Sequence, residues 1–154
     1  MAYQKLQVER ALAVIASDTI NIPNVAGAST SGTTDGATTT DKLIDSTAAF
    51  TSNLLNYIVY NTTDSTVATV TAVDDANTLT LSADIMATGE AYVIYSDANT
   101  GCVLYSGSGG DVKVLTAGND EVTFTGVAAG AFIPVQVKRV FATPTPPTGI
   151  VALW

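Results

Sequence analysis

The side chains of this chain that are best suited to take part in catalysis are carboxylates near predicted turns. Two suitably spaced carboxyl groups are enough for glycoside hydrolysis, one as the general acid and the other as nucleophile or base. Aspartates are equally typical of turns, where they accept hydrogen bonds from the backbone. We therefore interpret these residues as solvated turn residues and assign no catalytic residue among them. The set is Asp74, Asp75, Asp111, Asp120 and Glu121.

Histidine and cysteine chemistry is restricted by the composition. The chain contains no histidine, so Ser-His and Cys-His nucleophile pairs cannot form. The single cysteine, Cys102, excludes an internal disulfide. Because no basic neighbour accompanies it, Cys102 is expected to be a small buried hydrophobic residue in a strand rather than a reactive thiol. We predict that the protein is not an enzyme.

Three short motifs resemble ligand or modification sites, and each has a simpler interpretation. Residues 107–110 (Gly-Ser-Gly-Gly) lack the Lys-Ser/Thr and the following helix of a phosphate loop, so they predict a turn. Residues 126–130 have glycine spacing but lie between strand patterns, which predicts a loop. Asn61 begins an N-glycosylation sequence that matters only in a secretory pathway. No calcium-loop spacing occurs, and we predict no metal and no cofactor.

The composition limits the classes of partner that this chain is expected to bind. Of 154 residues, 47% are hydrophobic and only 13% are charged, about half the usual charged fraction of globular domains. The net charge of -8 repels phosphate backbones, so nucleic-acid binding is not expected. No apolar run approaches the roughly 20 residues that span a bilayer, so no membrane association is expected. Residues 11–16, preceded by Lys5, Glu9 and Arg10, are too short for a signal peptide and predict the first strand of a protein that is not secreted.

Strand patterns dominate the chain. Short runs rich in Val, Ile, Thr, Tyr and Phe alternate with Gly, Asn and Asp turn signals. The alternation is imperfect in residues 66–73 and cleaner in residues 78–82, which predict a half-buried antiparallel strand with its leucines inward. Residues 74–77 between these two segments predict a hairpin loop. A helical turn is expected only within residues 46–56. The predicted strands are residues 12–15, 57–60, 67–73, 79–81, 92–95, 103–105, 112–115, 122–124, 132–141 and 150–153.

A compositional break divides the chain. Residues 28–40 contain no large apolar side chain, which predicts a linker or surface loop. We expect residues 1–30 and 100–154 to form one discontinuous β domain, with residues 31–99 inserted as a β module. The predicted fold is all-β, an antiparallel β-sandwich or barrel with a small inserted β-barrel-like module. The expected module core is Leu43, Ile44, Phe50, Tyr57, Val59, Val70, Val73, Leu79, Leu81, Ile85, Tyr92 and Ile94.

The C-terminus is expected to be docked rather than free. Residues 150–154 end the chain on Trp154 and would expose hydrophobic area unless a sheet or a neighbouring subunit covered them. The proline-rich residues 143–148 should run extended and act as an arm. If this arm crosses to another subunit, the tail completes a partner's core, which would give a homo-oligomer, with a trimer favoured.

Several segments together resemble a known family. Residues 103–114, 122–130, 132–140 and 150–154 are similar to the C-terminal half of phage spike-base proteins, the family that includes the head-spike base of gene-transfer agents. Residues 10–14, 17–19 and 22–23 resemble the opening of the same family. The segments at residues 41–47, 59–64 and 78–85 resemble a small β module of phage structural proteins, and this inserted block is where the chain departs from the spike-base pattern.

The resemblance implies a structural virion protein of a tailed phage, assembled in the host cytoplasm. The expected role is head decoration (a cement protein) or spike base, binding the major capsid protein or other virion proteins on the capsid exterior as a homo-oligomer. One alternative is a tail or baseplate component. Another is a receptor- or carbohydrate-binding module, because exposed aromatic rings stack on sugars, although their strand positions favour packing. The aromatic residues concerned are Tyr57, Tyr60, Tyr92, Tyr95 and Tyr105.

Overall fold

The computed structural model describes residues 8–27, 29–37 and 39–154, so Lys5 of the signal-peptide argument, and Ala28 and Thr38 of the expected linker, lie outside the described residues. The described chain is all-β, with two antiparallel sheets, which confirms the predicted fold class. It forms two compact units. Unit 1 comprises residues 8–26 and 99–154, and unit 2 comprises residues 27–98. No helix in the described part of the chain is long and apolar enough to cross a membrane.

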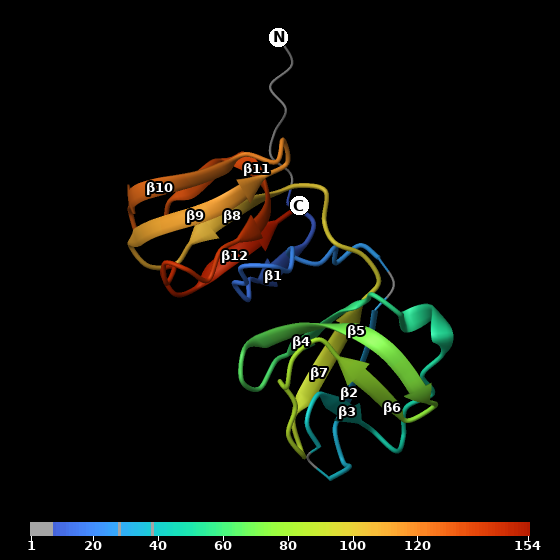
Figure 1. Ribbon diagram of the computed structural model, residues 1–154. Helices are drawn as coiled ribbons and strands as arrows, with labels where there is room; N and C mark the ends of the chain where they lie inside the picture. Colours follow the sequence, from blue (N-terminus) through green and yellow to red (C-terminus); the bar gives the residue numbers. More distant parts are fainter. Residues whose placement is uncertain (1–7, 28, 38) are drawn as a thin grey trace. The chain divides into compact units, whose positions relative to one another are not determined.

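Unit 1 contains one six-stranded sheet in the order β1-β12-β8-β11-β9-β10 (Figure 1). Buried side chains alternate with less buried ones along β8, β9 and β12, as the period of two requires. Its core includes Ile22, Cys102, Leu104, Val137 and Ala152. The strands are β1 Ala11–Ala13, β8 Cys102–Ser106, β9 Gly110–Thr116, β10 Glu121–Val127, β11 Phe132–Val140 and β12 Ile150–Leu153.

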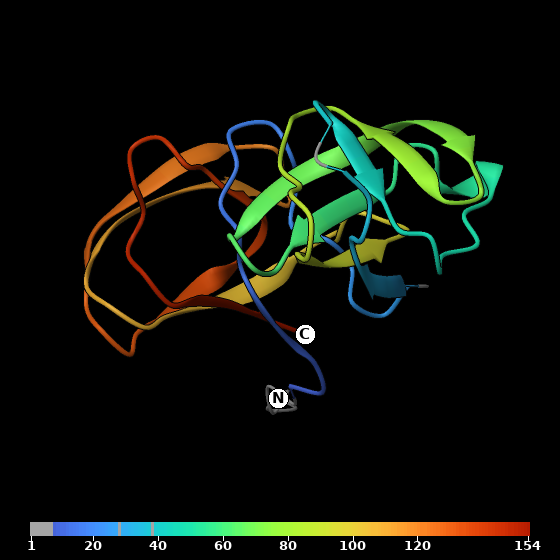
Figure 2. The same ribbon diagram turned by 90° about the horizontal axis from the view of Figure 1, so that it is seen from below.

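Unit 2 contains the second six-stranded sheet, in the order β2-β7-β4-β5-β6-β3. The sheet curls around its core, and the curl is visible in two perpendicular views (Figures 1 and 2). Two irregularities in the pairing of β5 with β6 accompany the bend. The elements are β2 Ser29–Thr33, β3 Lys42–Ile44, the short 3-10 helix η1 Ser52–Leu54, β4 Ile58–Asn61, β5 Thr66–Asp75, β6 Thr78–Leu81 and β7 Ala91–Tyr95.

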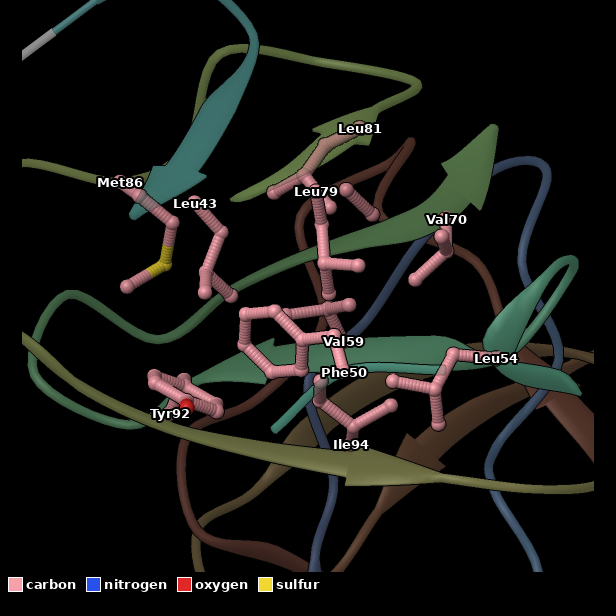
Figure 3. Close-up of a cluster of buried hydrophobic side chains, with 11 residues drawn as sticks. Leu43, Phe50, Leu54, Val59, Val70, Leu79, Leu81, Met86, Tyr92 and Ile94 are labelled. Atoms are coloured by element: carbon pink, nitrogen blue, oxygen red, sulfur yellow. The ribbon is translucent and has the colours of Figure 1, made fainter. Parts of the chain in front are cut away.

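The core of unit 2 contains the predicted apolar set except Ile44, with Tyr57, Val73 and Ile85 only partly buried against it. It also contains Leu54, Ala68 and Met86, which were not predicted. Leu79 and Leu81 point inward as expected, and Figure 3 shows them with Leu43, Phe50 and other buried side chains gathered inside the curled sheet. Ile44 is half-buried outside this cluster, because it alternates with the buried Leu43 and packs over Gly36 instead.

The prediction of a linker or surface loop at residues 28–40 is wrong for the first half of that segment. Residues 29–33 form β2, which pairs with β7 along its whole length. Thr34 is buried and its hydroxyl donates to the carbonyl oxygen of Glu90 at 3.2 Å. Backbone pairing requires no large side chain, which explains how a segment of small residues joins the sheet. The first unit boundary therefore falls before β2, after Ala26, rather than after residue 30, and the second falls after Ala98.

Two smaller expectations also need correction. The loop between β5 and β6 is only Ala76-Asn77, because Asp74 and Asp75 belong to β5. Asn77 holds this turn: its Nδ2 donates to three carbonyl oxygens, those of Asp45, Ser46 and Ala48, at 3.1, 3.0 and 2.8 Å. The helical turn expected within residues 46–56 is confirmed only as η1.

The C-terminal tail is docked, as expected, but in its own unit. Strand β12 lies between β1 and β8, and Trp154 packs against the core. Both ends of the proline-rich arm are also held within unit 1. Thr143 donates to Asp18 through its N–H at 2.9 Å and its hydroxyl at 2.8 Å, and the N–H of Thr148 donates to Ser108 at 2.9 Å. The tail therefore completes the sheet of its own unit.

Candidate functional site

Two aspartates of unit 2 that were considered for glycoside hydrolysis, Asp74 and Asp75, have structural roles in the sheet. Both lie in β5 rather than in a turn. Asp74 accepts a hydrogen bond from Lys42 Nζ at 2.7 Å, and this contact holds its pKa below the usual range. Asp75 Oδ1 accepts from the N–H of Asn77 at 2.7 Å. These contacts stabilise the β5–β6 turn.

The three acidic candidates of unit 1 are likewise engaged in the sheet. Asp111 in β9 accepts from the N–H of Gly126 at 2.7 Å, and Glu121 in β10 pairs with Lys113 at 3.0 Å. Only Asp120 lies between strands, where its N–H donates to the hydroxyl of Thr116 at 3.1 Å. The expectation that all five residues occupy turns was too broad, because strand ends use aspartates in the same way as turns do.

The glycine-rich segments behave nearly as predicted. Residues 107–109 connect β8 to β9, and a strand follows them rather than the helix of a phosphate loop. Gly126 and Val127 lie inside β10, at a bulge where Gly126 has a φ of 62°, so the loop is confined to residues 128–131. Both loops are therefore shorter than expected, the first by Gly110 alone.

Cys102 is a core residue, as predicted. It is 1% exposed in β8, its thiol donates to the carbonyl oxygen of Val137 at 3.2 Å, and burial raises its pKa to about 12. A neutral, covered thiol is a poor nucleophile.

We expect a maleimide to label Cys102 in the native protein at least about a hundredfold more slowly than in the denatured chain, because labelling requires the sheet to open. The measurement is mass spectrometry of timed samples. A Thr125→Cys variant, with its new thiol on the exposed β10, is the control and should label rapidly at that position. Equal rates at the two sites would contradict the buried assignment.

Asn61 is unsuitable as a glycan acceptor because its side chain is buried. Its side chain is fully buried, with Nδ2 donating to the carbonyl oxygen of Ile85 at 2.6 Å and to Glu90 at 2.8 Å. Its Oδ1 accepts from the N–H groups of Thr63 and Asp64 at 2.9 and 3.1 Å. Asn61 therefore organises the β4–β5 turn.

Beside Asn61, the carboxyl groups of Asp64 and Glu90 share a hydrogen bond. This contact raises the pKa of Asp64, whereas the N–H of Ala87, 2.6 Å from Glu90 Oε2, lowers the pKa of Glu90. Asp64 is therefore the member of the pair that takes up a proton first as the pH falls. Among the described residues, no group of three or more His, Cys, Asp or Glu side chains is arranged to hold a metal ion.

Asp45 is a buried carboxylate that sequence analysis did not single out. It is 2% exposed, and it accepts from the hydroxyl of Tyr92 at 2.7 Å and from the N–H and hydroxyl of Thr47 at 2.9 and 2.7 Å. Burial alone would raise the pKa of Asp45, but these hydrogen bonds outweigh it and lower the pKa below 3.8. Burial and the nearby carboxylate together raise the pKa of Tyr92. The pair is thus an ionised acceptor with a neutral donor at neutral pH.

The most exposed large apolar residue of the described chain is Phe132, at 56%. It begins β11 opposite Tyr105, and their ring centroids lie 5.5 Å apart in an edge-on arrangement. Beside them is a hollow of about 310 Å³, lined by Val103, Phe132, Pro134, Val135 and Gln136. We call these five residues the β8–β11 hollow.

The β8–β11 hollow arises from a local break in the sheet. Pro134 has no N–H, and the pairing of β11 with β8 shifts register between Ile133 and Val137. The alternation along β11 buries Ile133 and Val137 and leaves Phe132 and Gln136 exposed. The sequence signal for this feature was a proline inside a predicted long strand.

The five tyrosines do not form an exposed sugar-stacking platform. Tyr60 and Tyr92 are each 2% exposed, and Tyr57, Tyr95 and Tyr105 are half-buried. Tyr60 and Tyr95 pack edge-on with centroids 5.7 Å apart. The predicted packing role is confirmed for this set.

No family model, curated protein or solved structure matches this chain.

Proposed function

We propose that this chain is a structural virion protein of a tailed phage, a head decoration or spike-base protein that binds the capsid exterior as a homo-oligomer. The spike-base resemblance of unit 1 and the phage-module resemblance of unit 2 motivate the proposal. The all-β fold is compatible with it, since almost all the contacts of ionisable side chains described above stabilise a strand or a turn.

The observation that carries the proposal is the β8–β11 hollow. Its lining contains no charged residue, and Phe132 is exposed in its wall. The central parts of protein interfaces are rich in aromatic residues and poor in charge. A hollow of this composition on one sheet face suits a protein partner better than a polar ligand, and the partner we assign to it is a shell protein of the virion.

The test is addition of the purified chain to bare heads of the phage that carries its gene. We expect the full chain to bind heads, and a Phe132→Ser variant to bind at least about tenfold more weakly, because central aromatic residues dominate interface energies. The matched control is Leu55→Ser, which removes a 47% exposed apolar side chain from unit 2. Light scattering of the same samples gives the oligomeric mass, for which a trimer is favoured.

Three outcomes would overturn the head assignment. Binding to isolated tails but not to heads would make the chain a tail or baseplate component. If Phe132→Ser and Leu55→Ser weakened head binding equally, the β8–β11 hollow would not be part of the interface. Turnover of a substrate by the purified chain would contradict the structural role altogether.

A further inference from the structure

Strand β10 is a free edge of the unit 1 sheet, with β9 as its only neighbour in the strand order. An edge strand offers unpaired backbone groups to another chain, so native proteins usually keep such strands short or place lysine or proline on them. Of the other edge strands in the described sheets, β1 and β3 have three residues each, and β2 has no apolar side chain. Strand β10 has seven residues, without lysine or proline.

The backbone groups of β10 that face the free edge can be identified from its hairpin with β9. The N–H of Thr116 donates to the carbonyl oxygen of Asp120 at 2.9 Å, so these two residues face each other as a hydrogen-bonded pair. Such pairs recur at every second residue of an antiparallel ladder. The even-numbered residues that follow therefore bond to β9, and the N–H and C=O groups of Glu121, Thr123 and Thr125 point to the free edge.

The side chains of β10 are divided between two faces by the same alternation. Val122 and Phe124 lie opposite Val114 and Val112, which are both fully buried, so all four share the core face of the sheet. Val122 is nevertheless 38% exposed, and Phe124 is only partly buried against the core. A strand laid along the free edge of β10 would therefore cover apolar surface as well as pair with the backbone.

We propose that this edge pairs with β10 of a second copy, antiparallel, about a two-fold axis at Thr123. Thr123 then lies opposite its own counterpart, Glu121 opposite Thr125, and Val122 opposite Phe124. All three edge-facing residues of each copy enter hydrogen-bonded pairs, which gives about six bonds between the chains. The apolar side chains meet on the core face, whereas the two Glu121 carboxylates stay apart.

The distribution of charge favours a copy of unit 1 as the partner. Residues 1–26 and 99–154 contain five acidic and five basic side chains, whereas residues 27–98 contain nine acidic and one basic. The whole net charge of -8 thus belongs to unit 2, and two copies of unit 1 meet without net repulsion. The one charged residue of β10, Glu121, is already paired with Lys113 at 3.0 Å.

This inference rests on the homo-oligomer of the proposed function and specifies one of its contacts. A two-fold contact uses the same surface on both partners and joins copies in pairs. The pairing therefore predicts a dimer, and a trimer formed through other surfaces would associate further into a hexamer.

The first test is disulfide cross-linking of the full-length chain with copper phenanthroline, in which the buried native Cys102 takes no part. Thr123→Cys should give a covalent dimer, because the Cα atoms of a hydrogen-bonded pair lie about 5.5 Å apart. Thr125→Cys, also exposed on β10, is the matched control and should not cross-link, since its two copies are displaced by about 13 Å along the strands. A mixture of Glu121→Cys and Thr125→Cys should cross-link, although neither does so alone.

The second test is Thr123→Pro, which removes an N–H that faces the edge, where proline is tolerated. Sedimentation should show dimerisation weakened at least about tenfold, because the central pair of bonds is lost. Thr123→Ala keeps the backbone donor, is the matched control, and should dimerise like the native chain. Amide NMR signals of Leu104 and Val137 verify that unit 1 is still folded.

The proposal is overturned if Thr123→Cys does not cross-link, if Thr125→Cys alone cross-links equally, or if folded Thr123→Pro dimerises like Thr123→Ala. Should Thr123→Pro unfold unit 1, the cross-linking pattern decides by itself. All these measurements use the purified chain without heads. A failure of β10 pairing is therefore distinguishable from a failure of head binding, which Phe132→Ser reports.

Discussion

Deletion of residues 150–154 is expected to unfold unit 1. The deleted segment contains β12, which pairs on one side with β1 and on the other with β8. It also removes Ile150 and Ala152, which are 5% and 0% exposed. Losing an interior strand costs hydrogen bonds on both edges and opens the core, and domains of ordinary stability have only about 5–15 kcal/mol to lose.

The measurement is an amide NMR spectrum of the truncated chain. Signals of unit 1 should collapse to unfolded positions, whereas those of unit 2 should stay dispersed, because its core consists entirely of its own residues. Val151→Thr, which keeps the strand and its pairing, is the control and should leave both sets of signals dispersed. Native signals for Leu104 and Val137 in the truncated chain would show that β12 is dispensable.

This expectation changes how oligomerisation should be tested. A truncated tail cannot report on assembly if it unfolds the unit that carries it. Phe132→Ser is the better probe, since it alters an exposed side chain and leaves β12 in place.

Replacement of Asp45 by asparagine is expected to destabilise unit 2 by about 2 kcal/mol. The amide has one acceptor oxygen, so it cannot satisfy the donors of Tyr92 and Thr47 together, and a buried donor left without a partner costs about 1–3 kcal/mol. For a unit of this size the melting temperature should fall by about 10 °C. The measurement is thermal unfolding followed by unit 2 signals, with the exposed Asp97→Asn as the control.

The deficit of Asp45→Asn should depend on pH. Because the folded-state pKa of Asp45 lies below its ordinary value of 3.8, the carboxylate contributes stability above that value and loses it as the pH falls through the folded-state pKa. The gap between native and variant protein should therefore be full at neutral pH and shrink in acid. Tyr92→Phe completes a double-mutant cycle, and additive losses would mean that the two side chains do not act as a pair.

Strand positions could be predicted because their signal is local. In β6, leucines alternate with threonines, and the leucines are buried as the period of two requires. The burial of Cys102 followed in the same way from its place in a strand-like run without basic neighbours. Such inferences need only the neighbouring residues along the chain.

The predictions that were wrong concern residues whose environment is set by distant segments of the chain. Strand β2 has no apolar pattern and exists because β7 offers it a free edge. Ile44 was placed in the core by its hydrophobicity, but the alternation of β3 turns it toward Gly36. Neither result can be obtained without knowing which strand lies alongside.

The sequence by itself determined that this chain builds all-β units, that its C-terminal tail must be covered, and that no histidine chemistry is available. Only the tertiary structure decided that the tail covers its own sheet, that Pro134 lies at a break in the pairing beside Phe132, and that Gly32 packs directly against the buried Asp45 and Tyr92. The physical reason is that hydrophobicity fixes which side chains avoid water, whereas strand pairing between distant segments fixes what each of them contacts.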